Sequence, residues 1–288
     1  MLFAATPFGA RTTRPAQGKT MKHTRWPQLR FLVAAGVLVT GALTIAIADD
    51  TTGANRTGDI GDTNQVRVAT FSSLQPGDDL PPEWEPVHIA GIPKHTEYTL
   101  VSVDGVTVLR AVADAAMSGL ARKVDIDPNT TPWLHWRWRI ARPNEKSALH
   151  TKRGDDFPAR IYVFFDFDIM RLSLLERIII RIARVLYGER LPLAALCYVW
   201  SNDDPPGTTA WNAYTKRVHM VVASSGAGQV GQLIAVERNV RGDFRKAFGE
   251  PVPRITGIAI ATDSDETGEN SMAWYGDISF SRQLQEIQ

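Results

Sequence analysis

Residues 133–140, WLHWRWRI, constrain the fold more than any other segment, because large apolar and cationic side chains alternate there. Successive side chains of an extended strand point to opposite faces, so this alternation predicts a strand with one core face and one cationic face. The core face carries Leu134, Trp136, Trp138 and Ile140, and the cationic face carries His135, Arg137 and Arg139.

Similar short runs rich in Val, Ile, Tyr, Phe and Trp recur along the chain, separated by Gly, Pro, Asp and Asn clusters, which is typical of strands joined by turns. Asp104-Gly105 is a two-residue hairpin signal. So many strands predict a mainly β protein, a two-sheet antiparallel β-sandwich of jelly-roll type. The expected strands are 96–103, 106–113, 133–140, 160–167, 195–201, 218–223, 232–239, 257–262 and 272–281. In the last of them, we expect Trp274 to share a face with Gly276, Ile278 and Phe280.

Two segments interrupt this pattern. Residues 170–187, MRLSLLERIIIRIARVLY, predict an inserted amphipathic helix with Arg177, Arg181 and Arg184 on one face. Such a helix either packs across the sandwich with its arginines in solvent or lies on an anionic membrane surface. A short helix is expected at 243–248, capped by Asp243 and ended by Gly249.

The N-terminal 48 residues predict export. A basic stretch is followed by the apolar run 31–47 and by small residues up to Ala48, the order of a secretory signal cleaved after Ala48. The alternative is an uncleaved anchor in the inner membrane, because the run approaches the length of a spanning helix. We therefore expect a periplasmic or extracellular protein: residues 1–48 an N-terminal extension and signal, 49–65 a flexible leader, and 66–288 one domain.

Charge and cysteine content exclude several classes of function. The chain has 32 basic and 31 acidic residues, and residues 1–48 hold six of the basic and none of the acidic ones, so the remainder has a net charge of about −5. Such a balance does not predict nucleic-acid binding. Cys197 is the only cysteine, which leaves no intrachain disulfide, and its apolar neighbours indicate a packed, unreactive thiol.

Asp155 and Asp156 form an acidic turn before the strand that begins at Arg160. Two carboxylates buried together would raise the pKa of one of them and create a proton donor, as glycoside hydrolysis requires. The second carboxylate of such a pair could come from Asp203, Asp204, Glu237 or Asp263. Alternatively, one aspartate caps a turn and the other pairs with Arg160 or with the cationic face of 133–140.

A second acidic segment, 263–269, follows the strand 257–262. Asp263 and Asp265 supply oxygen ligands at alternating positions before Gly268, an arrangement that a hard cation such as calcium accepts. The loop is not an EF-hand, because Trp274 stands at its twelfth position. It is either a one-loop calcium site completed by a distant carboxylate or a solvated acidic turn.

Aromatic side chains give a third signal. Trp200 ends a strand and is followed by Asn202, and Trp211 and Tyr214 lie in the next loop. Aromatic rings beside polar side chains are typical of sugar-binding sites, because the apolar face of a sugar stacks on a ring. Trp200 packs either at such a site or in the core of the sandwich.

Four segments in order resemble a family of exported bacterial proteins known as domain of unknown function 3047: KRGDDFPARIYVFF, LCYVW, VERNVRGDFRKAFGE, and IAIATDSDETGE with WYGDISF. The family commonly has Asn where this chain has Cys197. The resemblance implies a signal-bearing, mostly β protein with the architecture of galactose-binding-like sandwiches, and it implies no particular activity.

Three functions follow as hypotheses. The favoured one is a non-catalytic module that binds a small molecule, a carbohydrate or an envelope glycan through Asp155, Asp156, Arg160, Trp200, Asn202 and Asp263. The second is a glycan hydrolase that uses Asp155 or Asp156 with another carboxylate. The third is a structural envelope protein that contacts the membrane through 170–187. Convergence of the aspartates at 155, 156, 263 and 265 in a pocket would support a metal or catalytic site, whereas their dispersal along two edges would indicate turns.

Overall fold

The structure is a computed structural model that describes residues 65–89, 91–166 and 194–283. The expected signal segment and the 170–187 helix lie outside these residues, and so does the expected flexible leader except for its last residue, Gln65, which begins a strand. Within the described part of the chain, no helix has both the length and the apolar character needed to cross a membrane.

Thirteen strands in these residues form two sheets. The first sheet has the order β11-β6-β13-β4-β3, with β1 paired to β13. Its strands are β1 (Gln65–Ala69), β3 (Glu97–Val103), β4 (Val106–Asp114), β6 (Trp133–Ile140), β11 (Ile234–Asn239) and β13 (Asn270–Ser281). The second sheet has the order β2-β5-β12-β7-β8-β10-β9. Its strands are β2 (Glu85–Val87), β5 (Met117–Ile126), β7 (Arg160–Phe165), β8 (Ala194–Ser201), β9 (Thr209–Trp211), β10 (Val218–Ser225) and β12 (Ile255–Asp263).

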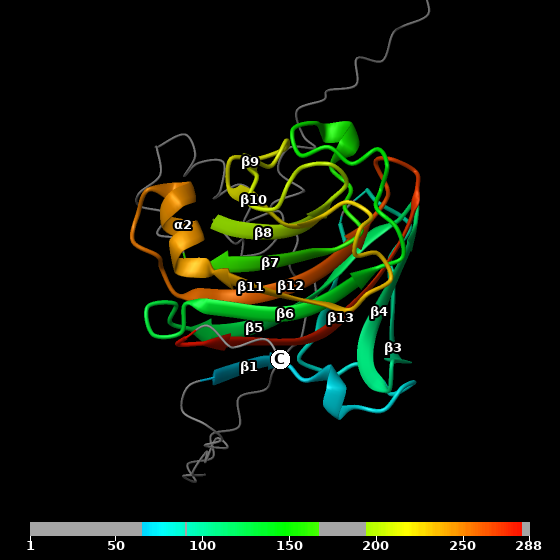
Figure 1. Cartoon of the computed structure of the whole chain (residues 1–288), viewed down its shortest axis with the longest axis horizontal. Coiled ribbons are helices and arrows are strands. Elements are labelled where there is room, and N and C mark those ends of the chain that lie inside the picture. The colour runs from blue at the N-terminus through cyan, green and yellow to red at the C-terminus, as the bar shows by residue number, and fades with distance from the viewer. Residues whose placement is uncertain (1–64, 90, 167–193, 284–288) are drawn as a thin grey trace, which may run out of the picture.

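Figure 1 shows the two sheets stacked on each other, with the single α-helix of the described residues, α2 (Val240–Phe248), at one end of the strands. Every pairing is antiparallel except that of β8 with β10, which is parallel. Two 3₁₀ turns, η2 (Phe71–Ser73) and η3 (Lys152–Gly154), lie in the connections. The expected two-sheet sandwich is therefore confirmed.

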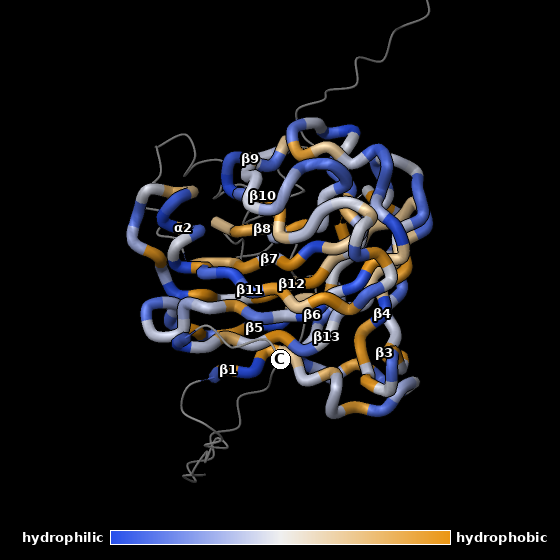
Figure 2. Tube along the Cα trace, viewed as in Figure 1, coloured by the Kyte–Doolittle hydropathy of each residue, from blue (hydrophilic) through white to orange (hydrophobic). Residues whose placement is uncertain are grey.

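The core lies between the sheets, where aromatic side chains of β6 meet those of β8. The ring centroids of Trp136 and Tyr198 are 5.4 Å apart, and those of Trp138 and Trp200 are 5.9 Å apart. Figure 2 shows hydrophobic residues along the stacked strands and hydrophilic residues in the surrounding connections. Every residue of β8 is buried, because the connection that contains Leu149 and Phe157 covers the outer face of this part of the second sheet.

Most strand predictions are confirmed, and β6 has the predicted boundaries. Asp104 and Gly105 both have positive φ, 52° and 80°, as a two-residue hairpin turn requires. The sequence prediction missed β5, a strand of ten residues between β2 and β12. Gly119 and the charged pair Arg122-Lys123 interrupt its apolar pattern, and pairing on both edges outweighs that weak local signal.

The predicted face of Trp274 is wrong. The register between β13 and β6 shifts between Tyr275 and Ile278, so Tyr275 is buried together with Ile278 and Phe280, and Trp274 lies on the opposite, partly exposed face under the Arg139 guanidinium. Gly276 occupies this bulge, where an added Cβ would lie 3.1 Å from the Cβ of Arg137.

The predicted cap of the short helix is also wrong. The helix begins earlier, after Asn239, whose side chain accepts a hydrogen bond from the Gly242 N–H at 2.8 Å. Asp243 instead pairs with Arg238 and accepts a hydrogen bond from the Tyr198 hydroxyl. Gly249 ends the helix in the left-handed conformation, as expected.

Candidate functional site

The site is organised by Arg160, a buried guanidinium that is 2% exposed. Arg160 begins β7 and pairs with Ala261 near the end of the antiparallel strand β12. Asp263, two residues further along β12, therefore lies beside the Arg160 side chain. The Arg160 Nε donates to Asp263 Oδ1 at 2.9 Å, and Nη2 lies 2.6 Å from Asp263 Oδ2. Nη1 donates to Asp155 Oδ1 at 3.1 Å and to the Tyr162 hydroxyl at 3.3 Å, and Nη2 also donates to the Asp155 carbonyl.

Four of the five N–H groups that a guanidinium carries donate hydrogen bonds, and the fifth, on Nη2, faces Asp263 Oδ2 in an ion pair without a hydrogen bond. Arg160 therefore orients the two acidic loops, and its guanidinium is committed to Asp155, Asp263 and Tyr162. Burial alone would lower the pKa of Arg160, but Asp263, Tyr162 and Asp155 raise it well above its ordinary value. Burial raises the pKa of Asp263, and the contacts with Arg160 and the Phe157 N–H oppose that rise.

Backbone bonds tie the two acidic loops together. The Phe157 N–H donates to Asp263 Oδ1 at 2.8 Å, and the Thr267 N–H donates to Asp156 Oδ2 at 2.6 Å. Gly154 allows the first loop to turn tightly, because an added Cβ would lie 2.7 Å from the Ala148 nitrogen. Each loop thus holds a carboxylate of the other in place.

Asp156 is completely buried, but only one of its carboxylate oxygens has a partner. Oδ2 accepts from Thr267, whereas Oδ1 has no hydrogen-bond partner among the described residues. Burial raises the pKa of Asp156, because desolvation penalises the ionised form. Asp265 lies in the turn after β12, and burial together with the neighbouring Asp156 raises its pKa to about 6.

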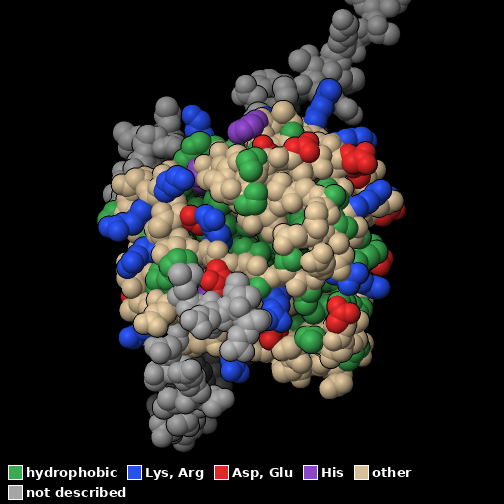
Figure 3. Space-filling model, in the orientation of Figure 1, with side chains coloured by type: hydrophobic (Ala, Val, Ile, Leu, Met, Phe, Trp, Pro, Cys, Tyr) green, Lys and Arg blue, Asp and Glu red, His purple; other side chains and the backbone are tan. Residues whose placement is uncertain are grey.

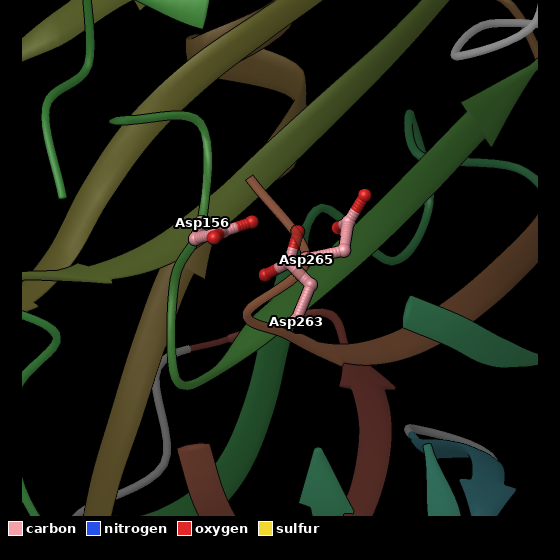
Figure 4. Close-up of side chains that lie close together, drawn as sticks. All are labelled: Asp156, Asp263 and Asp265. Carbon is pink, nitrogen blue, oxygen red and sulfur yellow. The ribbon is translucent and has the colours of Figure 1, made fainter. Parts of the chain in front are cut away.

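Asp156, Asp263 and Asp265 form an acid cluster. Each offers a carboxylate oxygen, and these oxygens lie within 4.8 Å of one another. Figure 4 shows Asp156, in the loop before β7, facing Asp263 at the end of β12, with Asp265 beside Asp263 in the following turn. In Figure 3, Asp and Glu side chains gather at the upper right, the same end of the molecule as the loop between β12 and β13 in Figure 1. Such a cluster can share protons or hold a hard cation.

A cavity of about 520 Å³ opens beside the acid cluster. Its apolar wall contains Ile89, Ile92, Pro93, Met117 and Val218. Its polar wall contains Asp155, Tyr162, Asn212, Tyr214, Asp265 and Glu266. Arg160, Asp263 and Lys94 also line it. The cavity lining therefore has four carboxylates, Asp155, Asp263, Asp265 and Glu266, against two cationic side chains, so the cavity is acidic.

Asn212 and Tyr214 are fixed within this wall. The Asn212 amide donates to Asp155 Oδ2 at 2.7 Å. The Tyr214 hydroxyl donates to the Lys152 carbonyl at 3.2 Å and contacts Glu266, and the Lys152 ammonium lies 5.1 Å from the centre of the Tyr214 ring. Partial burial raises the pKa of Tyr214 above its ordinary value, and the neighbouring Glu266 carboxylate raises it further. Tyr214 was noted in the sequence only as an aromatic residue, and nothing in the sequence marks Asn212.

The structure brings together most of the residues that the sequence singled out. Asp155, Arg160, Asp263 and Asp265 line the cavity, and Asp156 adjoins it. Asp155 pairs with Arg160, which confirms the ion pair of the alternative interpretation, and Asp156 accepts a hydrogen bond from Thr267 in the other acidic loop.

Two candidates lie elsewhere. Trp200 is 0% exposed in the core, where its Nε1 donates to the Gly226 carbonyl at 3.1 Å, so its ring is not available to a ligand. Asn202 lies outside the cavity lining and donates to the Glu145 carbonyl.

Of the proposed second carboxylates, only Asp263 reaches the acidic turn. Asp204 accepts a hydrogen bond from Ser201, Asp203 accepts one from Asn202, and Glu237 lies 3.0 Å from the Nδ1 of His135 on the first sheet. Cys197 is buried, and burial raises the pKa of its thiol to about 12, consistent with a packed, unreactive side chain.

Several solved structures resemble this one at low identity. The family 30 carbohydrate-binding module of a cellulosomal cellulase of Clostridium thermocellum is 12% identical, with a TM-score of 0.35 over 77% of this chain and 99% of that one. The carbohydrate recognition domain of Emp47p is 13% identical, with a TM-score of 0.37 over 78% of this chain and 100% of that one. At such TM-scores, what these proteins bind is not transferred to this chain.

No curated protein matches the chain in sequence. The family described as "Protein of unknown function (DUF3047)" matches residues 82–279, which is more than half of the chain. The protein is therefore a member of the DUF3047 family.

Proposed function

We propose that this protein is a binding protein whose cavity takes a neutral, hydroxyl-rich ligand, most simply a carbohydrate or a glycan of the cell envelope. The observation that carries the proposal is the lining of the 520 Å³ cavity, which combines carboxylates and an amide with tyrosine rings and an apolar wall. Hydroxyl groups donate to carboxylates, and the apolar face of a sugar packs on rings and aliphatic side chains.

Charge argues against an anionic ligand. The carboxylates that line the cavity outnumber its cationic groups, and the Arg160 guanidinium is held by Asp155, Asp263 and Tyr162. An anionic ligand would meet repulsion without a free guanidinium to offset it. The expected signal segment is consistent with a ligand outside the cytoplasm, and periplasmic or extracellular location is part of the proposal.

A paired-aspartate hydrolase receives less support. Asp156 is completely buried and bonded to Thr267, and Asp155 is held by Arg160 and Asn212. A general acid must reach the bond that it protonates. Asp156 does not line the cavity, so binding without catalysis fits the geometry better.

A glycan array followed by calorimetry with the best binder tests the proposal. We expect Asn212→Ala to weaken binding by about tenfold or more, because it removes a polar group of the cavity wall and loosens Asp155. Asn202→Ala is the matched control, since the same amide is removed outside the cavity, and it should bind as the wild type does. Absence of any binder on the array and of any retained ligand in native mass spectrometry would overturn the proposal, as would equal losses in the two variants.

A further inference from the structure

The strongest unexplained feature of the site is the unpartnered oxygen of Asp156. Its side chain is 0% exposed, and Oδ1 has no hydrogen-bond partner among the described residues. A buried carboxylate oxygen without a partner is unfavourable, and most buried polar atoms are paired. The Thr267 N–H fixes the other oxygen at 2.6 Å, so the carboxyl group is held toward Asp263 and Asp265 (Figure 4).

The cationic side chains of the described residues balance the charges of the acid cluster only in part. Arg160 forms ion pairs with Asp155 and Asp263. Asp156 and Asp265 form no ion pair among the described residues, although their oxygens lie within 4.8 Å of each other and of Asp263. Two uncompensated carboxylates at this separation repel each other strongly in a low-dielectric site. Two positive charges at this point would balance them.

We propose that Asp156, Asp263 and Asp265 bind a divalent cation, with Ca²⁺ the best fit, at the edge of the cavity. The ligands are all carboxylate oxygens, which suit hard cations, and neither His nor Cys belongs to the cluster, so zinc is disfavoured. Arg160 repels the cation and lowers its affinity. We therefore expect a weak site, with a Kd on the order of 10⁻⁴ M, as in extracellular calcium modules.

The cation leaves coordination positions open toward the ligand. Ca²⁺ takes six to eight oxygen ligands, more than three carboxylates supply, and Asp263 and Asp265 both face the cavity. Hydroxyl groups of the bound ligand can occupy the remaining positions. This second step rests on the proposed function, whereas the cation site itself does not.

Calorimetric titration of the chelator-treated protein with CaCl₂ and, separately, MgCl₂ tests the site. We expect one Ca²⁺ site, a rise in melting temperature with added Ca²⁺, and Tb³⁺ luminescence sensitised by Tyr162 and Tyr214. Asp156→Asn and Asp265→Asn should each weaken Ca²⁺ binding at least tenfold, and the exposed Asp203→Asn should not. Asp265→Asn guards against a folding defect of the buried variant, and circular dichroism checks both.

Each outcome decides the proposal. No heat with either cation and no Tb³⁺ luminescence overturns it, as does wild-type affinity in Asp265→Asn. Tighter binding of Mg²⁺ than of Ca²⁺ overturns the choice of calcium. If the glycan identified on the array binds equally well with and without chelator, coordination of the ligand by the cation is wrong. Ca²⁺ binding without any glycan binder would overturn the proposed function and leave the cation site standing.

Discussion

The acid cluster beside the cavity and a second buried polar group on the first sheet, here called the strand cluster, differ in how completely their polar atoms are paired. The strand cluster consists of His135, Glu237 and Ser281. The His135 Nδ1 lies 3.0 Å from Glu237 Oε1, and Nε2 lies 2.7 Å from Ser281 Oγ. In the acid cluster, by contrast, Asp156 Oδ1 and Asp263 Oδ2 have no hydrogen-bond partner among the described residues, although Asp263 Oδ2 forms an ion pair with Arg160.

The origin of the two groups explains the difference. Glu237 and His135 are direct partners in the ladder of β11 and β6, and Ser281 lies on the neighbouring strand β13, so ordinary strand pairing brings the strand cluster together. The acid cluster comes from the loop before β7, the last residue of β12 and the turn after it, which meet only at the end of the second sheet. A closed polar network stabilises a fold, whereas an open one beside a cavity is available to a ligand.

The largest expected effect is that of Arg160→Met in the acid cluster. Removal of the guanidinium leaves Asp155 and Asp263 buried without a counter-charge, which should lower the free energy of unfolding by about 3–5 kcal/mol. Urea denaturation of the wild type and the variant, in the presence of a chelator, measures this change in the free energy of unfolding. Arg139→Met is the control, because Arg139 stacks on Trp274 without an ion pair among the described residues, and it should cost about 1 kcal/mol or less. Equal losses would mean that Arg160 does not organise the site.

The next effect belongs to the strand cluster. His135→Asn should lower the free energy of unfolding by about 1–3 kcal/mol, because Glu237 and Ser281 lose a buried partner. Affinity for Ca²⁺ and for the cavity ligand should not change. A loss of either affinity, measured by calorimetry in a folded variant, would contradict the division between the two clusters.

A smaller effect of opposite sign is expected for Asp156→Asn in the absence of divalent cations. The amide removes an uncompensated buried charge and can donate to Asp263 or Asp265, so the free energy of unfolding at pH 7 should stay equal or rise by about 1 kcal/mol. The raised pKa of Asp156 agrees with this direction, because it means that the folded protein is less stable with Asp156 ionised than with it neutral. A destabilisation above about 1 kcal/mol in chelator would show that the Asp156 carboxylate supports the fold.

The smallest effect concerns pH. Burial lowers the pKa of His135, although Glu237 opposes the shift. The unfolded chain then takes up a proton near pH 6.5 while the folded protein resists it, so this contribution to stability is present above pH 6.5 and is lost as pH falls toward the folded pKa. The difference in unfolding free energy between wild type and His135→Asn should shrink between pH 7.5 and pH 5.5. A difference that grows over this range would reverse the assigned sign.

Sequence patterns predicted regular strands better than they predicted bulges and strands with a weak apolar pattern. The alternation of 133–140 identified β6 and its core face, because period-two patterning is a local property. The bulge at Gly276 was not predicted, because it reverses the alternation halfway along β13 and depends on pairing with β6. β5 was not predicted, because neighbours on both edges stabilise a segment whose own pattern is weak.

For the site, the sequence by itself determined which residue types stand at the strand ends: Asp155 and Asp156 before β7, and Asp263 and Asp265 at and after the end of β12. Only the tertiary structure decided that β7 and β12 are antiparallel neighbours, which places both acidic segments at one end of the second sheet around Arg160. It also placed Trp200 in the core and Asn212 in the cavity wall. The physical reason is that burial and strand pairing depend on segments distant in the chain. Strand propensity and the alternation of apolar and polar residues, in contrast, depend only on neighbouring residues.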